Sequence, residues 1–266
     1  MAGAERRLDV ALAERGLARS RSHAAALIAE GLVTVDGQPV VRAAAKVGDG
    51  QELRIAGADH YVSRGAHKLI AALDGFGVDP AGRIALDAGA STGGFTQVLL
   101  ERGAARVIAV DVGHGQLSPA LAGEERLESY EGVNVRSLSP EVLAGLTGDD
   151  VRPDLVVADL SFISLTQVLP ALVATAVRGA DFLLLIKPQF EVGRQGIREG
   201  VVRDAGLRAD AVSDVLWAAH DVGLGTAGLI PSPIAGGHGN REFLVWLRSG
   251  APDPSGLRDE VVRLSR

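Results

Sequence analysis

The sequence of 266 residues contains no cysteine. This absence excludes disulfide bonds, cysteine-bound zinc and thiol catalysis. Residues 1–9 have no apolar core, so we expect no signal peptide. The longest stretch without charge, Leu160–Val177, contains Pro170 and several hydroxyl side chains, and its apolar residues recur at helical spacing. A helix packed on a sheet explains this stretch better than a membrane span, and we expect a cytoplasmic protein without a membrane partner.

Lysine is also scarce, because Lys46, Lys68 and Lys187 are the only lysines among 27 basic residues. Arginine serves almost everywhere that a surface cation is enough. A lysine kept in such a chain has one property that arginine lacks, a compact ammonium group that can lose its proton. Chance is the plain alternative, so scarcity marks these lysines as candidates without assigning them a role.

The net charge of −6 argues against a nucleic-acid partner at first sight. The charge is unevenly distributed, however. Residues 1–58 carry eight basic and seven acidic side chains, a net +1, which leaves nineteen basic and twenty-six acidic side chains in the remainder, a net −7. The first segment can therefore present a basic face that the overall balance hides.

A glycine-rich segment, residues 86–95, lies between a short apolar strand (83–86) and a helix (95–103). Strand, turn and helix in this order bring backbone N–H groups close to a ligand, and glycine permits the close approach. A second apolar strand, 106–111, ends in Asp111, whose carboxylate can accept hydrogen bonds from both ribose hydroxyls of a nucleoside. Asp87, ahead of the first glycine, disfavours a pyrophosphate and suits an amine or a sulfonium. The pattern predicts an S-adenosylmethionine site rather than a dinucleotide site.

The expected cofactor-binding residues are Asp87, Gly89, Ala90, Ser91, Thr92, Gly93, Gly94, Phe95 and Asp111. A glycine-rich turn that binds nothing is the alternative. It does not explain why both acids and the glycines fall at the spacing that such a site needs. No metal is expected.

Residues 6–55 indicate a compact module of two helices and a small sheet. Helices are expected over 7–16 and, capped by Ser20, over 21–30; strands are expected over 32–35, 40–41 and 51–55. Arg19 and Arg21 lie at the N-terminus of the second helix, where cations oppose the helix dipole, so they are placed to meet a phosphate.

The same module resembles the S4 RNA-binding domain. The segments that carry the resemblance are Arg-Leu-Asp (7–9), Ala-Arg-Ser-Arg-Ser-His-Ala (18–24), Gly-Leu-Val-Thr-Val-Asp-Gly (31–37) and Val-Gly-Asp-Gly (47–50). The resemblance implies RNA contacts from Arg6, Arg7, Arg19, Ser20, Arg21 and Lys46. The alternative is a small stabilising domain with solvated arginines.

The rest of the chain alternates strands with helices, which is typical of an α/β doubly wound, Rossmann-like sheet. Strands are expected over 133–136, 154–159, 181–186, 226–231 and 242–247, and helices over 69–73, 162–178 and about twenty residues from 204. Ligands lie at the carboxyl ends of the strands in such sheets. Lys68, Asp159, Lys187 and Glu242 can meet at that edge; each alone has an ordinary structural explanation, but together, beside the cofactor motif, they indicate a catalytic group.

This Lys-Asp-Lys-Glu set resembles the tetrad of FtsJ-type RNA 2′-O-ribose methyltransferases. The whole chain is similar to the haemolysin-named TlyA family of rRNA cytidine-2′-O-methyltransferases, through Ser-Arg-Gly-Ala-His-Lys (63–68), Gly-Ala-Ser-Thr-Gly-Gly-Phe (89–95), Ala-Asp-Leu-Ser-Phe-Ile-Ser (158–164), Lys-Pro-Gln-Phe-Glu (187–191) and Gly-Asn-Arg-Glu (239–242). The resemblance implies that Lys187 is the general base on the 2′-hydroxyl and that Asp159 orients it. Lys68 and Glu242 would set the local field and help to hold the nucleoside. The resemblance also implies ribosomal RNA as the partner. The RNA of the small subunit (16S) is the first candidate, and the RNA of the large subunit (23S) is a further one.

We expect an S4-like domain over 1–58, a linker over 59–67, a methyltransferase domain over 68–250 and a C-terminal extension over 251–266. Two other functions stay open. One is a non-catalytic ribosome-binding or assembly factor, against which the intact tetrad argues. The other is a membrane-active haemolysin, against which the lack of a basic amphipathic segment argues.

Overall fold

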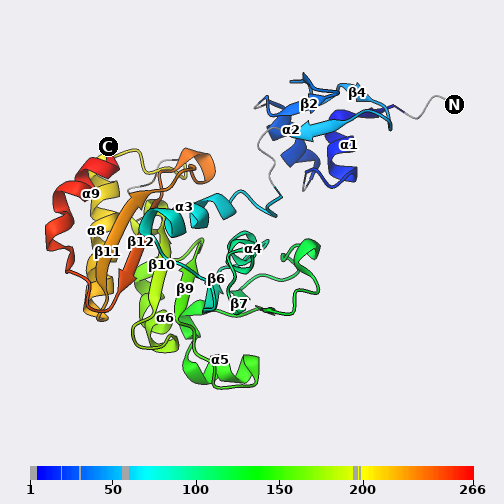
Figure 1. The fold of residues 1–266 in the computed structure, drawn as a ribbon. Coiled ribbons are helices and arrows are strands. Elements are labelled where there is room, and N and C mark those ends of the chain that lie inside the picture. The colour runs from blue at the N-terminus through cyan, green and yellow to red at the C-terminus, as the bar shows by residue number, and fades with distance from the viewer. Residues whose placement is uncertain (1–4, 19, 30, 56–59, 194–196, 198) are drawn as a thin grey trace. The chain divides into compact units, whose positions relative to one another are not determined.

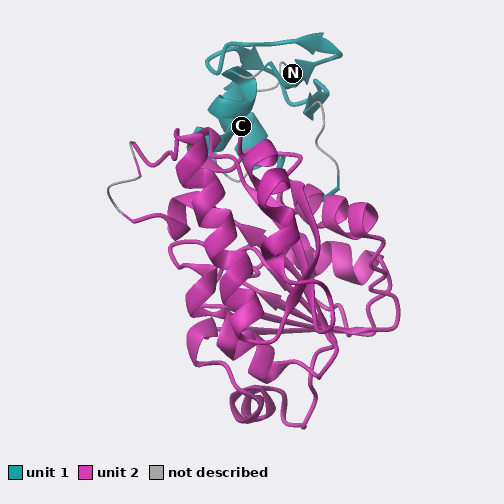
Figure 2. Cartoon of the chain, turned by 90° about the vertical axis from the view of Figure 1, so that its left-hand side faces the viewer, with its two compact units in different colours: residues 1–61 teal, residues 62–266 magenta. Residues whose placement is uncertain are grey.

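The computed structural model describes residues 5–266 apart from 19, 30, 56–59, 194–196 and 198. The chain divides into two compact units, residues 1–61 and 62–266, which Figure 2 shows in different colours. Each unit buries its own set of apolar side chains, as independent domains do. Within the described ranges, no helix combines the length and apolar character that crossing a membrane requires.

The N-terminal unit packs two helices against short strands (Figure 1). Its elements are β1 (Arg6–Arg7), α1 (Leu8–Glu14), α2 (Arg21–Ala29), β2 (Val33–Val35), β3 (Gln38–Pro39), β4 (Lys46–Val47) and β5 (Leu53–Ile55). Strand β2 pairs antiparallel with β3 and β5, and β1 pairs antiparallel with β4. Leu8, Leu12 and Ile28 from the helices are fully buried against Val33 of the sheet.

The predicted strand at 40–41 is wrong by two residues. Asp36 and Gly37 both have positive φ, 50° and 79°, and form a two-residue turn. Such a turn pairs the residues on either side of it directly, so Val35 lies opposite Gln38 and the returning strand begins at once.

The C-terminal unit is built on a seven-stranded sheet in the order β11-β12-β10-β9-β6-β7-β8 (Figure 1). The strands are β6 (Ile84–Ala88), β7 (Arg106–Asp111), β8 (Leu127–Glu131), β9 (Leu155–Ala158), β10 (Asp181–Ile186), β11 (Gly225–Pro231) and β12 (Phe243–Arg248). Five neighbouring strands run parallel, namely β10, β9, β6, β7 and β8. Strand β12 is antiparallel to both β10 and β11. The predicted α/β class and the closing antiparallel pair are confirmed.

Helices cover both faces of this sheet. They are α3 (Ala66–Phe76), α4 (Gly94–Glu101), α5 (Pro140–Thr147), α6 (Leu169–Thr175), α7 (Pro188–Glu191), α8 (Ala205–Asp221) and α9 (Arg258–Ser265), with short 3-10 helices at 119–121, 135–137, 165–167, 237–239 and 254–257. One buried cluster joins α5, α6, α8 and α9 to one face of the strands. Helices α3 and α4 contact each other and cover the opposite face of the sheet. There α3 contacts β11 and β12, and α4 contacts β6 and β7.

The third parallel strand is β8, not the predicted 133–136 segment. Residues 127–131, Leu-Glu-Ser-Tyr-Glu, form an edge strand that is at most half-buried, so its sequence is too polar to show a strand pattern. Asn134 instead caps a 3-10 helix over Val135–Ser137.

The predicted helix over 162–178 is also wrong at its start. Phe162 has a φ of 64°, which a helix does not accept, and Ser164 caps a 3-10 helix at Leu165–Gln167. The α-helix begins only at Leu169, with Pro170 in its first turn. The residues freed from the helix form the loop that follows Asp159.

Two further boundaries differ from expectation. Helix α3 continues through Gly75 and ends at Phe76, before Gly77, which has a φ of 69°. A Cβ at Gly75 would lie 3.0 Å from Ile230 of β11, so this glycine allows close packing rather than ending the helix. Residues after 250, which the sequence indicates only as a polar extension, include α9, whose Val261 belongs to the core cluster.

Candidate active site

The glycine-rich turn has the conformation that its sequence predicts. Gly89 and Gly93 have φ values of 85° and 91°, which residues other than glycine rarely adopt. A Cβ at Gly89 would lie 2.9 Å from Leu160, and the space beside Gly93 is filled by Leu117 and Leu121. The turn leads directly into α4, whose first residue is Gly94.

Asp111 joins the two halves of the expected cofactor site. Its Oδ2 accepts a hydrogen bond from Ser91 N at 2.8 Å, and its Oδ1 accepts one from Gly113 N at 2.7 Å. A carboxylate oxygen has lone pairs for more than one donor. Asp111 can therefore hold the glycine-rich turn and still accept hydrogen bonds from ribose hydroxyls.

Asp87 is completely buried in β6. Its Oδ2 accepts a 2.6 Å hydrogen bond from Thr96 Oγ1, and its Oδ1 has no hydrogen-bond partner among the described residues. Burial raises the pKa of this carboxyl to about 7, although the bond from Thr96 opposes the rise. A buried carboxyl oxygen without a partner, beside a glycine-rich turn, fits a cationic ligand such as a sulfonium.

Segments distant in sequence cover this turn. Ser118 N donates to Thr92 O at 3.2 Å, which ties residues 113–121 to the turn. On the other side, Ser63 Oγ occupies the space that a Cβ at Gly94 would need. Sequence reasoning missed both contacts, because neither segment carries a pattern that points to its partner.

The structure brings the four predicted catalytic residues together. Lys68 lies in the first turn of α3, Asp159 follows β9, Lys187 follows β10, and Glu242 precedes β12. Because Ile186 pairs with Phe243 in antiparallel register, the start of β12 lies beside the end of β10. Glu242 thereby reaches the edge at which the parallel strands end.

The tetrad forms a continuous chain of ion pairs. Lys68 Nζ lies 2.7 Å from Glu242 Oε2 and 3.4 Å from Asp159 Oδ2, while Lys187 Nζ lies 2.6 Å from Asp159 Oδ1. The side chains of the two lysines are each 9% exposed, and those of Asp159 and Glu242 are 21% and 2% exposed. Two ammonium and two carboxylate groups balance, which makes their burial tolerable.

Two polar side chains that sequence reasoning missed also contact the tetrad. Ser161 Oγ accepts a hydrogen bond from Lys187 Nζ at 2.8 Å, and Gln189 Nε2 donates to Glu242 Oε1 at 3.3 Å. Each lies two residues after a tetrad member at a strand end. That spacing was the available signal.

An exposed aromatic side chain stands beside the tetrad. Phe162 is 91% exposed, and its positive φ is strained for a residue other than glycine. Its ring centroid lies 5.2 Å from that of Phe190, which in turn lies 5.8 Å from Lys187 Nζ. Glu191 supports this loop by accepting hydrogen bonds from Ser164 Oγ and from Leu165 N.

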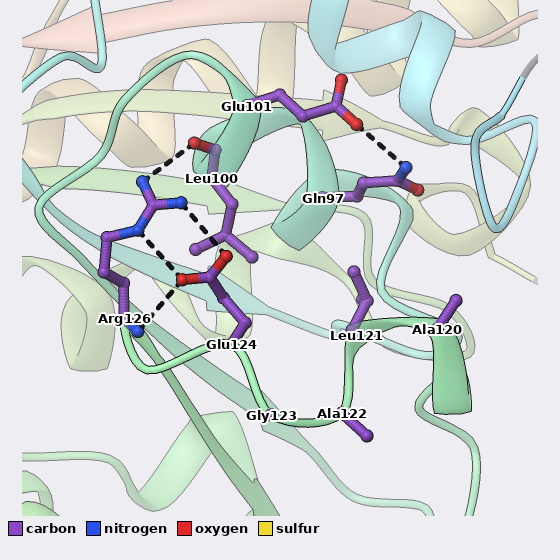
Figure 3. Close-up of a pocket in the computed structure, with 9 residues that line it drawn as sticks. All are labelled: Gln97, Leu100, Glu101, Ala120, Leu121, Ala122, Gly123, Glu124 and Arg126. Carbon is purple, nitrogen blue, oxygen red and sulfur yellow. Dashed lines mark hydrogen bonds and ion pairs between the residues drawn. The ribbon is translucent and has the colours of Figure 1, made fainter.

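A surface hollow of about 390 Å³ lies elsewhere, beside α4 (Figure 3). Arg126, which lines it, is bound to Glu124 and to the carbonyls of Leu100 and Ala104. None of the tetrad or glycine-turn residues lines this hollow. It is therefore separate from the site that the sequence predicts at the strand ends.

The predicted RNA-binding residues lie in the N-terminal unit and are partly paired. Arg7 and Arg21 both bind Asp9, at 2.9 and 3.5 Å, and Arg6 binds Glu14 at 2.8 Å. The side chains of these arginines remain 45–64% exposed, and Asp9 holds two of them in place.

The other predicted RNA contacts occupy the same unit. Ser20 Oγ accepts a hydrogen bond from His23 N at the start of α2, and the exposed Lys46 pairs with Arg7 across the β1–β4 register. Arg19 lies outside the described residues. In the part of the chain that is described, no cluster of three metal-ligand side chains occurs.

Comparisons with known proteins agree with this geometry. Residues 61–249 match the model of the FtsJ-like methyltransferases, and residues 6–53 match that of the S4 domain. The chain is 50% identical over 97% of its length to a 16S/23S rRNA (cytidine-2′-O)-methyltransferase, TlyA, of Mycobacterium tuberculosis, of which it covers 96%.

Solved structures show the same similarity. A hemolysin-named protein of Streptococcus thermophilus superposes with a TM-score of 0.78 at 39% identity, over 99% of this chain and 96% of that one. A protein of Listeria monocytogenes that is named as an S-adenosylmethionine-dependent methyltransferase, 11% identical, superposes with a TM-score of 0.51 over 69% of this chain and 97% of that one, and shows the fold alone.

Proposed function

The chain belongs to the TlyA family, in which an S4 domain precedes an FtsJ-like methyltransferase domain, and we propose that it methylates the ribose 2′-hydroxyl of cytidine in ribosomal RNA. The observation that carries the proposal is the tetrad. Two buried lysines share one aspartate at the carboxyl edge of the sheet, beside a glycine-rich turn with an acid on either side. The 16S and 23S specificity of the relative from Mycobacterium tuberculosis makes both subunits candidates.

S-adenosylmethionine, when bound, supplies a methyl group that is electrophilic because it is attached to a sulfonium. The residues that would hold the cofactor are those of the glycine-rich turn, 89–95, together with the two acids that flank it. Asp111 would accept hydrogen bonds from the ribose hydroxyls. Asp87, with its unpartnered Oδ1, would favour the charged methionine part.

Lys187 would remove the proton from the 2′-hydroxyl. Lys68 contacts two carboxylates and serves as a fixed positive charge, whereas Lys187 contacts a single carboxylate oxygen and the hydroxyl of Ser161. A neutral amine there can accept a proton, and Asp159 then pairs with the ammonium that forms. Glu242 holds Lys68 in place through its 2.7 Å contact.

Phe162 would bind the target base. A large aromatic ring that is almost fully exposed is suited to stacking on a nucleobase, and stacking needs a base that has left its helix. The neighbouring Phe190 packs against Phe162 and lies close to Lys187, which would bring the ribose of a stacked nucleotide towards the base catalyst.

Residues 1–58 would recruit the RNA, residues 59–67 would link the two domains, and residues 68–250 would carry out the transfer, with residues 251–266 as an extension. The half-exposed Arg6, Arg7 and Arg21, with Lys46, would contact phosphates. Because ribosomal subunits are the substrate, the protein would act in the cytoplasm.

Mass mapping of ribosomal RNA tests this proposal directly. RNA from cells with and without the protein should differ by methyl groups on specific cytidines, and the purified protein should restore them with S-adenosylmethionine. Identical RNA from both cells, together with retained binding to ribosomal subunits, would instead identify a non-catalytic assembly factor. Lysis of lipid vesicles by the purified protein at low concentration would support the haemolysin activity.

A further inference from the structure

Ser161 is an exposed residue that contacts the proposed base. Its hydroxyl oxygen accepts a 2.8 Å hydrogen bond from Lys187 Nζ, and Asp159 Oδ1 lies 2.6 Å from the same nitrogen. Ser161 is exposed, whereas the side chain of Lys187 is 9% exposed. The amine of Lys187 therefore contacts one carboxylate and one hydroxyl, and the residue that carries the hydroxyl is exposed.

The contact with Ser161 restricts the direction in which the Lys187 amine can accept a proton. A neutral lysine amine carries two N–H donors and one lone pair. The hydrogen bond to Ser161 Oγ fixes one donor, and the ion-pair contact with Asp159 Oδ1 at 2.6 Å occupies a second position around the nitrogen. The lone pair then takes a remaining position, from which it can accept a proton from a substrate hydroxyl. Without the hydroxyl of Ser161, the amine can rotate and the lone pair loses its direction.

We propose that Ser161 is a positioning residue for the methyl transfer, which fixes the direction of the Lys187 lone pair and carries the captured proton to water. This inference rests on the proposed function of Lys187 as the base. Lys68 has no equivalent arrangement, because its described contacts, with Glu242 and Asp159, are both to carboxylates.

The proton balance of the step is complete. The 2′ O–H bond breaks as a new N–H bond forms on Lys187, and the ribose oxygen bonds to the methyl carbon while the electron pair of the broken C–S bond stays on sulfur. The ammonium of Lys187 then gives a proton to Ser161 Oγ, and Ser161 releases its own hydroxyl proton to water. The hydroxyl and the neutral amine are restored without any further reactant.

Two variants of nearly equal shape isolate the hydroxyl. Ser161→Thr keeps it, and Ser161→Val replaces it with a methyl group. The assay is single-turnover methylation by the full-length protein, with saturating S-adenosylmethionine and ribosomal subunits from cells that lack the protein. We expect the valine variant to be slower than the threonine variant by roughly 10–100-fold, because small displacements of a reacting group cost about that much. Cofactor and subunit affinities should agree within a few-fold, and equal rates for the two variants overturn the inference.

The pH dependence separates positioning from a purely structural role. In the valine variant the rise of rate with pH should move to lower pH, because the ammonium form of Lys187 has lost a hydrogen-bond acceptor. A slower valine variant with an unmoved profile and a lower melting temperature would mean that the hydroxyl only supports the loop.

A Lys187→Ala background separates failure of this inference from failure of the proposed mechanism. If Ser161 acts through Lys187, the threonine and valine variants must have the same residual rate once the amine is gone. A difference that persists there refutes the inference. A parental rate for Lys187→Ala alone would remove the proposed base, whatever the Ser161 variants do.

Discussion

Replacing Lys187 with arginine tests why this arginine-rich chain carries a lysine at the end of β10. The guanidinium keeps the positive charge and can keep the ion pair with Asp159, which lies 2.6 Å from the lysine nitrogen. It cannot accept a proton, because its pKa lies above about 12. The substitution thus removes the acid–base chemistry and retains most of the electrostatics.

The expected magnitudes follow from the surroundings of the side chain. Lys187 is only 9% exposed and lies near the Phe190 ring, so the bulkier arginine should cost up to about 3 kcal/mol of stability through overpacking. Loss of general base catalysis should lower the rate by roughly 10²–10⁴-fold. That range corresponds to about 2.7–5.4 kcal/mol in the activation free energy.

The assay is single-turnover methylation of ribosomal subunits by Lys187→Arg protein whose folding has been checked by thermal melting. Cofactor and subunit affinities should stay within a few-fold of the parent. Lys68→Arg is the matched control, because it makes the same change in the neighbouring lysine, for which we propose only a charge role. We expect Lys68→Arg to lose less activity than Lys187→Arg. A near-parental rate for Lys187→Arg would refute the base assignment and leave the fold and the cofactor site unaffected.

Four further predictions address the other parts of the molecule. Deleting residues 1–58 should weaken RNA binding and leave S-adenosylmethionine affinity nearly unchanged, and binding by the full chain should fall steeply with salt because phosphate contacts release counterions; a truncated protein that holds the RNA equally tightly would contradict the division of labour. Asp111→Ala should weaken cofactor binding by about 1–3 kcal/mol in calorimetry, because charge-assisted hydrogen bonds to the ribose are lost; unchanged affinity would show that this carboxylate serves only Ser91 and the turn. The affinity for S-adenosylmethionine should rise as pH increases through about 7, where the buried Asp87 ionises. S-adenosylhomocysteine, which has no sulfonium, should show a weaker rise. Equal pH profiles for the two ligands would exclude Asp87 as the partner of the sulfonium. The raised pKa of Asp87 also makes the stability of the fold depend on pH. The contribution of the protonated carboxyl to the free energy of unfolding is fully present below pH ~4 and is lost as pH rises towards 7, by up to about 4 kcal/mol. Asp87→Asn should abolish this loss in pH-dependent melting.

Local sequence determined the elements that have a strong pattern of their own. The buried strands β7 and β10 lie at the predicted residues, because a continuous apolar run between turn signals has few alternatives. Gly89 and Gly93 adopt the positive φ that the motif requires, and Asp204 caps α8 where a helix was expected to begin. The four tetrad residues could be chosen from the sequence because strand ends of a parallel sheet meet at one edge.

Tertiary contacts decided the elements whose local pattern is weak or misleading. The edge strand β8 is polar, yet it forms a strand because β7 offers it hydrogen-bonding groups. Gly75 stays inside α3 because β11 packs closely against it, although local propensity predicts an end. The loop after Asp159 replaces a predicted helical turn and leaves Phe162 exposed beside the tetrad.

The sequence by itself therefore determined the kind of chemistry, because it shows which groups are available at the predicted strand ends: glycines, lysines and carboxylates. Only the tertiary structure decided which of those groups contact one another. Asp159 is shared by both lysines, but among the described residues Lys187 and not Lys68 donates a hydrogen bond to a hydroxyl, that of the exposed Ser161. Such a difference depends on distances of a few ångströms between residues far apart in the chain, which no local pattern encodes.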